Sequence, residues 1–437
     1  MFKKHPKGLL TALLINMCVC FGFNVMMANL MPSLKTKFNL GYEEVGIIYS
    51  TFYFSIFVLT VAGGIIADKI KNHKGTVFAG IISMAAGCLI IAIPTPSTHT
   101  VFFVINCLGL LVIASGKGLI NGNLYAVIGQ MYDDPKYSEM RDAGFSLSYI
   151  FVCLSSSLSM LTVTFIIDYE TGFHSAFAVF IFAMAISSTI YLLNKKKLPT
   201  PATTEIYAIK IDVKEIRQRL FVLLAVWAVF DLFCVSFNQN GLTLTFFARD
   251  YVNLKDFEWG CRTLSYIHSF IVVLFMPVLL VIFGVLRAKG KEPSAPKKMV
   301  IGMGIAACAY ILLASGSIGL PDAAALNEIG WLPETERLTP FLLIGAYFIL
   351  TLAGLFIIPV GMSFVSKVSP LKYQGIMQSI WVSGAGISNG LLTLGVILYK
   401  HIPVWATWTI FSAVCFISMI IMLIMLKWIE KVAKYKI

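Results

Sequence analysis

The stretch Gly8–Leu34, GLLTALLINMCVCFGFNVMMANLMPSL, contains no charged side chain and decides the class of this protein. A helix needs about 20 mostly apolar residues to cross the hydrocarbon core of a bilayer. The stretch is long enough for that. It is too long for the apolar region of a secretory signal, and it lacks a small-residue cleavage site. We therefore expect it to be retained as the first transmembrane helix.

The composition of the whole chain supports the same class. Of its 437 residues 58% are hydrophobic and 13% are charged, whereas about a quarter are charged in an ordinary soluble domain. A soluble enzyme is therefore excluded. The net charge of +12 does not indicate a nucleic-acid partner, because the basic residues lie in short clusters between apolar runs. With no phosphate loop, nucleophile elbow or zinc motif, we expect no enzymatic activity, cofactor or metal site.

Charged or turn-rich breaks divide the chain into twelve apolar stretches of spanning length. The predicted fold class is therefore an all-α membrane protein with twelve transmembrane helices in two six-helix halves. The predicted spans are 9–33, 44–67, 75–94, 100–129, 143–167, 173–193, 219–240, 262–286, 299–318, 339–366, 374–399 and 403–426.

The distribution of lysine and arginine predicts the orientation. Most of these 34 residues lie at the two termini and in the loops that follow even-numbered spans. Basic residues concentrate on the cytoplasmic side of a membrane protein, so both termini are predicted to be cytoplasmic. We expect a multi-pass protein of the bacterial plasma (inner) membrane that acts as a monomer.

The longest basic connection, residues 195–218, contains two prolines and separates the halves 1–194 and 219–437. Two six-helix halves joined by a cytoplasmic linker are typical of many secondary transporters. Such proteins bind their solute near the bilayer midplane, where the two halves meet.

The segment between the second and third spans reads Gly63-Gly64-Ile65-Ile66-Ala67-Asp68-Lys69. It resembles the signature GxxxDRxxRR of the major facilitator superfamily. Glycine lets two helices approach closely, and Asp68 can accept hydrogen bonds from a helix N-terminus or pair with a basic group. The corresponding loop of the second half, Arg287–Lys298, has no such aspartate. The residues expected to act in gating are Gly64, Asp68, Lys69 and the candidate partner pair Arg141 and Asp142.

Four further stretches are similar to the proton-dependent oligopeptide transporter family. Gly116–Tyr132 resembles its pattern GxGxxKPNxxxxxGQxY, and Arg141–Tyr149 resembles RDxGFxxFY. Phe237–Asp250 and Pro359–Trp381 resemble FEQxGxxxxxFAxR and SPxGxSxxxKxxPxxxxGxMxxxW. The matches cover both halves in the family's order. The resemblance implies the major facilitator fold, a central cavity lined by the fourth and seventh spans, and peptide transport by alternating access with protons.

The chain departs from that family at its charged positions. Residues 8–34 lack the family's ExxERFxYY motif. Asn121 replaces the family's lysine and is followed by Gly122 instead of proline. Asn238 and Gly354 replace two glutamates, the second of which receives a peptide's amino group. The charges that bind a peptide and carry protons in the family are therefore absent from their usual positions.

Two charges do lie inside predicted spans. Lys117 is one turn before Asn121 and Asp231 is two turns before Asn238, so each shares a helix face with one of these positions. A charge in the bilayer core costs at least about 2.5–3.5 kcal/mol, which favours a functional role. Either the two residues pair across the halves or they titrate during transport. The alternative is that each is a structural charge near the cavity mouth, satisfied by water or backbone.

The predicted cavity consists of these two charges together with polar and aromatic side chains. A bound solute can supply the hydrogen-bond partners that buried amides need, although bonds between helices can do so equally well. The residues are Lys117, Asn121, Asn123, Tyr149, Asp231, Asn238, Gln239 and Trp381.

The predicted function is secondary active transport of a small organic solute, such as a peptide or peptide-like molecule, coupled to protons through non-standard residues. The alternatives are a uniporter or exchanger of another solute, and a transporter-like receptor that binds without transport. Histidines at span ends or in loops are usually solvated, and we assign none of them a role. These are His73, His99, His174 and His401.

Overall fold

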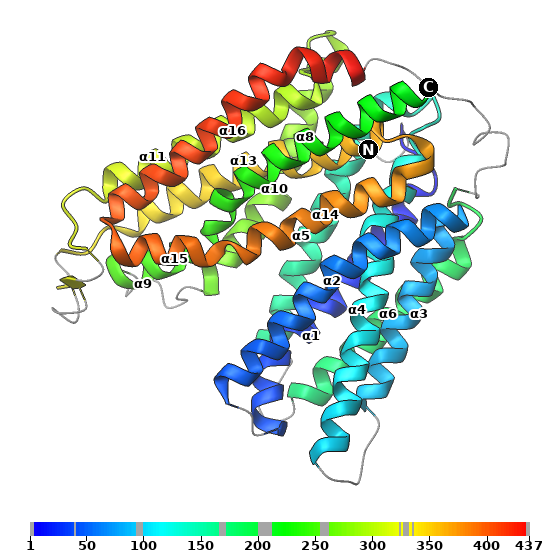
Figure 1. Cartoon of the computed structure of the whole chain (residues 1–437), viewed down its shortest axis with the longest axis horizontal. Helices are drawn as coiled ribbons and strands as arrows, with labels where there is room; N and C mark the ends of the chain where they lie inside the picture. The colour runs from blue at the N-terminus through cyan, green and yellow to red at the C-terminus, as the bar shows by residue number, and fades with distance from the viewer. Residues whose placement is uncertain are drawn as a thin grey trace. The chain divides into compact units, whose positions relative to one another are not determined.

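The computed structural model consists of helices joined by turns, apart from one isolated bridge between Val252 and Leu338 in the described part of the chain (Figure 1). The residues described are 4–38, 41–92, 99–165, 172–199, 212–253, 262–322, 325–326, 332–333 and 336–433. Within them, twelve helical segments are long and apolar enough to cross a membrane, which confirms the predicted fold class. A helix satisfies every backbone N–H and C=O inside its own segment, so apolar runs in a bilayer become helices.

The chain forms two compact units, one comprising residues 1–216 and 365–383 and the other 217–364 and 384–437. The predicted boundaries of the two halves and the linker remain predictions, and residues 200–211 of that linker lie outside the described residues. The helices up to the linker, all in the first unit, are α1 (Leu9–Phe38), α2 (Tyr42–Ile70), α3 (His73–Ala92), α4 (His99–Gln130), η2 (Ser138–Met140), α5 (Arg141–Phe165) and α6 (Gly172–Asn194). The helices that follow are α8 (Val213–Phe237), η3 (Asn238–Asn240), α9 (Thr243–Tyr251), α10 (Arg262–Ala288), α11 (Ala295–Gly316), α13 (Pro340–Val368), η5 (Leu371–Tyr373), α14 (Gln374–Gly390), α15 (Leu392–His401) and α16 (Val404–Ala433).

In the first unit, α3 and α4 pack along their lengths, α2 packs on α4, and α1 packs on α5 and α6 (Figure 1). Two pairs of glycines explain the close approach of α3 and α4. A Cβ atom added to Gly80 would lie 2.7 Å from the carbonyl oxygen of Gly116, and one added to Gly87 would lie 2.7 Å from that of Gly109. Small residues let helix backbones approach in this way where lipid provides no hydrophobic driving force.

In the second unit, α11 packs on α16 and aromatic side chains join them to α9 (Figure 1). The fully buried Trp408 of α16 stacks on Tyr310 and meets Phe247 edge to face. The seventh span does not end near residue 240 as predicted but continues to Tyr251. It continues because the polar turn at η3 stays inside the bundle, where Gln239 is fully buried and hydrogen-bonded, and α9 resumes the helix.

Candidate functional site

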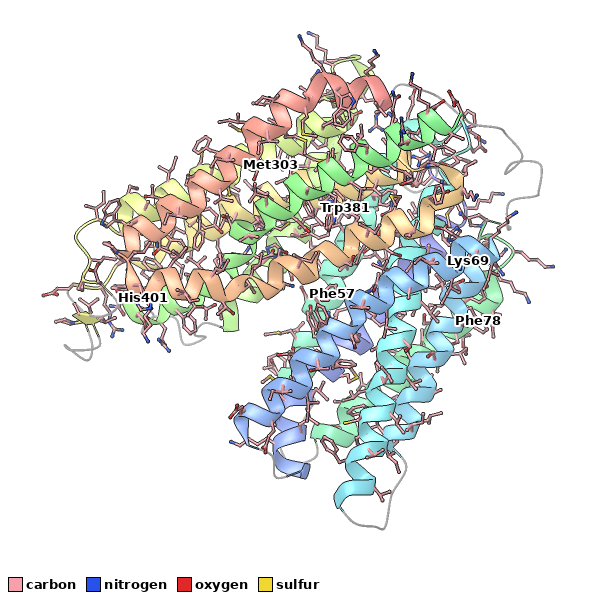
Figure 2. The ribbon with its side chains drawn as sticks, in the orientation of Figure 1. Phe57, Lys69, Phe78, Met303, Trp381 and His401 are labelled. Atoms are coloured by element: carbon pink, nitrogen blue, oxygen red, sulfur yellow. The ribbon has the colours of Figure 1, made fainter. Side chains whose placement is uncertain are left out.

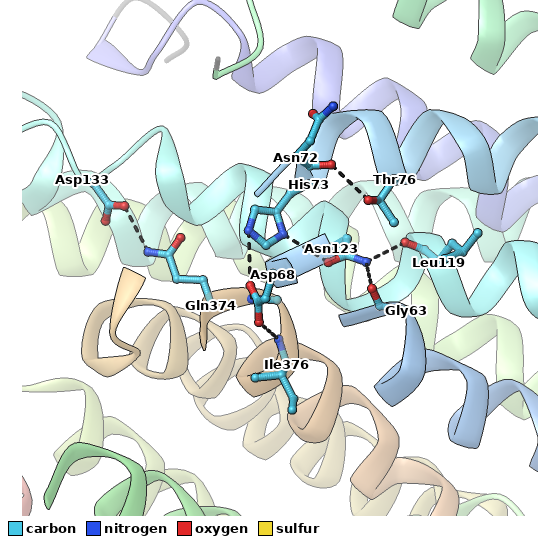
Figure 3. A network of polar contacts seen from close by, with 11 residues as sticks. Gly63, Asp68, Asn72, His73, Thr76, Leu119, Asn123, Asp133, Gln374 and Ile376 are labelled. Atoms are coloured by element: carbon cyan, nitrogen blue, oxygen red, sulfur yellow. Dashed lines mark hydrogen bonds and ion pairs between the residues drawn. The ribbon is translucent and has the colours of Figure 1, made fainter. Parts of the chain in front are cut away.

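Asp68 lies in the last turn of α2, and its carboxylate faces the first turn of α14 (Figure 3). Its Oδ1 accepts a hydrogen bond from the backbone N–H of Gly375 at 2.9 Å, and its Oδ2 accepts one from Ile376 at 2.8 Å. The first N–H groups of a helix have no acceptor within the helix, and the helix dipole favours an anion there. Of the two kinds of partner that the sequence allowed for Asp68, the structure has the helix N-terminus.

Two glycines allow α14 to reach this position. A Cβ atom added to Gly64 of α2 would lie 2.7 Å from the carbonyl oxygen of Gly375, and one added to Gly122 of α4 would lie 2.6 Å from Cα of Ser379. Backbone atoms at these distances cannot turn aside as a flexible side chain can. The glycine that replaces the motif's proline therefore makes room for Ser379.

His73, the first residue of α3, completes this group. Its side chain is only 3% exposed, so the expectation that it is solvated is wrong. The chain reverses through Lys71, whose φ of 56° is left-handed, and this sharp turn places the imidazole over the end of α2. Nε2 lies 3.4 Å from Oδ1 of Asp68, and Nδ1 lies 3.2 Å from Oδ1 of Asn123. The five-residue spacing between an acid and a histidine across a short loop was the available signal in the sequence.

Arg141, at the start of α5, does not pair with Asp68. Its buried guanidinium donates to Asp133 Oδ1 at 2.6 Å and to Ser366 Oγ at 2.7 Å. Gln374 donates to the other oxygen of Asp133 at 3.1 Å (Figure 3). Sequence reasoning missed Asp133, Ser366 and Gln374. Arg141 and Asp68 thus contact the same chain segment, residues 365–383, through different groups.

Tyr132 immediately precedes Asp133, the partner of Arg141, and lies outside the membrane spans. Its carbonyl oxygen accepts a hydrogen bond from Arg141 at 2.9 Å, and its hydroxyl lies 2.7 Å from Nδ1 of His5. Burial raises the pKa of the Tyr132 phenol, with a smaller opposing effect of Arg141. The phenol therefore stays neutral. The other two predicted gating residues lie nearby in the sequence, Lys69 exposed at the end of α2 (Figure 2) and Asp142 in the first turn of α5.

Lys117 lies on α4 and is 8% exposed. Its Nζ is 3.8 Å from Sγ of Cys20 and 5.0 Å from the centre of the Phe23 ring. Among the described residues it has no carboxylate within ion-pair distance. One turn along the same helix, the amide nitrogen of Asn121 lies 3.4 Å from the hydroxyl of Thr60 on α2. This amide thus makes the helix–helix bond that was its alternative role.

Asp231 of α8 lies in the second unit and is 9% exposed. Both of its carboxylate oxygens are buried, and neither has a hydrogen-bond partner in the described part of the chain. One turn earlier, the buried indole N–H of Trp227 also lacks an acceptor. Both side chains border Gly384 of α14, where an added Cβ atom would lie 2.7 Å from Trp227 Nε1 and 3.0 Å from Asp231 Cγ. Lys117 and Asp231 belong to different units, so their pairing stays a prediction.

The remaining predicted cavity residues are buried or partly buried. Asn238 donates to two residues of α14, Ser388 at 3.0 Å and Asn389 at 3.1 Å. Gln239 accepts from Thr243 and donates to the carbonyl of Val235, so its bonds stay within one continuous segment. Asn123 donates to the carbonyl oxygens of Gly63 and Leu119, and its Oδ1 faces His73. Trp381 is buried on α14 and Tyr149 is partly buried on α5 (Figure 2).

Comparison with known proteins gives a consistent result. The family model described as Major Facilitator Superfamily matches residues 12–332. An uncharacterized transporter, YclF, of Bacillus subtilis (strain 168) is 23% identical, over 87% of this chain and 85% of its own length. Dipeptide and tripeptide permease B of Xenorhabdus bovienii (strain SS-2004) is 21% identical, over 89% of this chain and 86% of its own. The crystal structure of a POT family transporter in complex with 5-aminolevulinic acid superposes with a TM-score of 0.66 at 19% identity, covering 98% of this chain and 97% of that one.

Proposed function

Because this chain belongs to the Major Facilitator Superfamily, whose members are transporters and not enzymes, we propose that it transports a small peptide-like solute and couples this transport to protons through Asp231. The solute class rests on distant homology, since the similar permease from X. bovienii is named for dipeptides and tripeptides. The transporter solved with 5-aminolevulinic acid supports a solute of this size. The proton coupling rests on the surroundings of one carboxylate.

The observation that carries the proposal is the burial of Asp231 without a partner. An ionised carboxylate away from water costs many kcal/mol unless cations or hydrogen-bond donors compensate it. Neither oxygen of Asp231 has a donor among the described residues, so the side chain is neutral and carries a proton in this arrangement. It can release the proton only when a rearrangement brings water or a cation to it. Alternating access supplies such a rearrangement.

The elements around Asp231 offer no compensating charge. α14 contains no charged residue. The other charges of α8 lie in its first two turns, the nearest being Arg219, twelve residues or about 18 Å along the helix. Cys234 is the titratable neighbour one turn further on, and its thiol is buried. Among the described residues of α8 and α14, no cation lies close enough to displace the proton on Asp231.

Lys117 supplies the second part of the proposal. Among the described residues, its buried ammonium has a thiol and an aromatic ring as neighbours but no carboxylate. A peptide-like solute carries a carboxylate, which would form a charge-assisted hydrogen bond with this group. Lys117 would then take the role that the family gives to lysine one turn later, at the position of Asn121.

The test uses the purified full chain in liposomes with radiolabelled L-alanyl-L-alanine and 5-aminolevulinic acid. An inward proton gradient should drive accumulation of at least one of these solutes by the wild-type protein. Asp231→Asn should lose this accumulation but keep counterflow, the exchange of labelled for unlabelled solute without a gradient. Asp212→Asn is the matched control, because this exposed residue caps the start of α8 and asparagine caps a helix equally well.

Three outcomes would contradict the proposal in different ways. Gradient-driven accumulation by Asp231→Asn would remove Asp231 as the coupling residue. Counterflow without gradient-driven accumulation in the wild type would indicate a uniporter or exchanger. Saturable binding without either activity would indicate a receptor.

A further inference from the structure

The hydrogen bonds around His73 fix where its first proton lies. The amide nitrogen of Asn123 donates to the carbonyl oxygens of Gly63 and Leu119, both at 2.9 Å (Figure 3). Carbonyl oxygens only accept, so the amide orientation is determined and Asn123 Oδ1 faces the imidazole. Oδ1 is also an acceptor, and it lies 3.2 Å from Nδ1 of His73. Nδ1 must therefore carry hydrogen.

The other imidazole nitrogen then meets a second acceptor. In neutral histidine with hydrogen on Nδ1, Nε2 has a bare lone pair. This atom is buried, has no hydrogen-bond partner among the described residues, and lies 3.4 Å from Asp68 Oδ1. An ionised carboxylate there would place two acceptors against each other in a buried site. One additional proton, on Nε2 or on the carboxyl group, removes the repulsion.

We propose that Asp68 and His73 together bind one proton when the first turn of α14 lies on Asp68, so that acid stabilises this arrangement. The proton belongs to the pair, in the way that strongly interacting groups titrate jointly. The two backbone N–H groups that donate to Asp68 favour its ionised form, whereas burial favours the neutral form of each partner, so the proton is shared by the pair. This inference does not depend on the transported solute or on Asp231.

Other charged groups lie around the pair. Asp133 is compensated by Arg141, to which it is bonded at 2.6 Å. His5 faces Tyr132, whose carbonyl oxygen accepts a hydrogen bond from Arg141. The lysines that surround the site on the α2–α3 loop, on α3 and on η5 are Lys69, Lys71, Lys74 and Lys372. The pH response therefore belongs to Asp68 and His73 together.

The direction of the pH effect follows from proton linkage. The pair holds one additional proton when α14 lies on Asp68. When α14 has moved away, a neutral histidine and an ionised aspartate hold no additional proton at neutral pH. The assembled arrangement is therefore favoured as pH falls and disfavoured as pH rises. One linked proton changes the equilibrium by up to about tenfold per pH unit.

Hydrogen–deuterium exchange of the start of α14 tests this directly. The N–H groups of Gly375 and Ile376 have no acceptor within their helix, so their protection reports the bond to Asp68. The full chain in lipid nanodiscs would be followed by mass spectrometry of peptides that cover residues 372–380. After correction for intrinsic exchange rates, protection should be higher at about pH 5.5 than at about pH 7.5, by up to about tenfold per pH unit.

Two variants separate the pair from other causes. His73→Gln should remove the pH dependence, whereas His401→Gln, the same change at an exposed helix end, should keep it. Asp68→Asn should lower protection at both pH values, which establishes that the carboxylate is the acceptor. A thermal melt of each variant verifies that the fold is retained.

Several results would overturn the inference. Equal wild-type protection at the two pH values would exclude a linked proton. Persistent pH dependence in His73→Gln would assign the proton to another group. Full protection in Asp68→Asn would mean that the amides of Gly375 and Ile376 do not report this contact.

Discussion

The loop between α2 and α3 and the loop between α10 and α11 have similar backbones but different polar partners. Each chain reversal passes through a left-handed residue, Lys71 with φ 56° in the first loop and Gly290 with φ 65° in the second. In each, the following N–H bonds to the carbonyl five residues back, at Ala67 and at Leu286. This is the bonding pattern with which helices commonly end.

The acidic residue of each loop meets a different kind of partner. Glu292 accepts from Arg287 at 2.6 Å and from Lys298 at 2.7 Å, and all three residues belong to one loop and its flanking turns. Asp68 accepts from backbone N–H groups about 300 positions away and faces a histidine. Arg287 and Lys298 lie close to Glu292 in the sequence, so the pairing does not depend on the position of a distant helix. The pairing of Asp68 depends on the position of α14 and on a proton, as a switch requires.

The largest expected effect breaks the fixed pairing of the second loop. Glu292→Gln leaves the ammonium of Lys298, which is 1% exposed, without its anion. Loss of one partner of a buried ion pair costs about 3–5 kcal/mol, so the variant should melt at a clearly lower temperature in detergent. Glu430→Gln is the control, because its partner Lys297 is half exposed and such pairs contribute at most about 1 kcal/mol. Equal melting temperatures for the two variants would refute the fixed pairing.

The next effect tests the close approach of α14 in the first unit. Gly122→Ala places a methyl group against the backbone of Ser379, and overpacking of this kind costs about 1–3 kcal/mol. Gly46→Ala is the matched control on α2, where an added Cβ atom meets nothing within 4 Å. That variant should be slightly more stable than wild type, by about 0.5–1 kcal/mol. Thermal melting and exchange at residues 372–380 measure both. Unchanged exchange in Gly122→Ala would contradict the described packing.

A smaller effect concerns the Asp68 carboxylate and transport. Asp68→Asn keeps one acceptor oxygen but loses the charge, and a hydrogen bond to a charged group contributes about 1.5–3 kcal/mol. We expect the arrangement with α14 to become about tenfold less populated and counterflow to slow by a similar factor, since about 1.4 kcal/mol corresponds to tenfold. Wild-type counterflow in this variant would show that the contact does not participate in gating.

The smallest expected effect compares the two left-handed residues. In the left-handed conformation a Cβ atom lies too close to the following carbonyl oxygen, which costs about 1–2 kcal/mol. Lys71→Gly should therefore stabilise the first unit by up to about 1 kcal/mol, and Gly290→Lys should destabilise the second by about 1–2 kcal/mol. Melting temperatures of the two variants should move in opposite directions. A shift in the same direction would mean that side-chain contacts of Lys71 outweigh its backbone strain.

Much of the fold was predictable because the signals are local. Apolar runs of about 20 residues with few charges mark each span, and the glycine–aspartate segment at 63–69 marks the first loop. The end of the seventh span was not predictable, because the polar turn at Asn238–Asn240 looks like a loop. Only its tertiary partners, such as Ser388, keep it inside the bundle.

The candidate site was less predictable because its partners are distant in the chain. Asp68 and Asn123 stood out as polar residues in motifs. His73 did not, since its burial depends on a turn and on a second helix. The role of Glu292 was also missed, because the sequence motif called for an aspartate and this loop has none. Asp231 was visible as a charge within a span, but the lack of hydrogen-bond partners at its oxygens could be seen only in three dimensions.

The most direct test of the central claim is proton movement during transport. Liposomes that contain the protein and an internal pH-sensitive dye would receive external L-alanyl-L-alanine or 5-aminolevulinic acid with no initial pH gradient. Wild-type protein should acidify the lumen as solute enters, and Asp212→Asn should do the same. Asp231→Asn should leave the internal pH constant while still exchanging labelled solute. Lumenal acidification by Asp231→Asn at the wild-type rate would contradict the assignment of the coupling proton to Asp231.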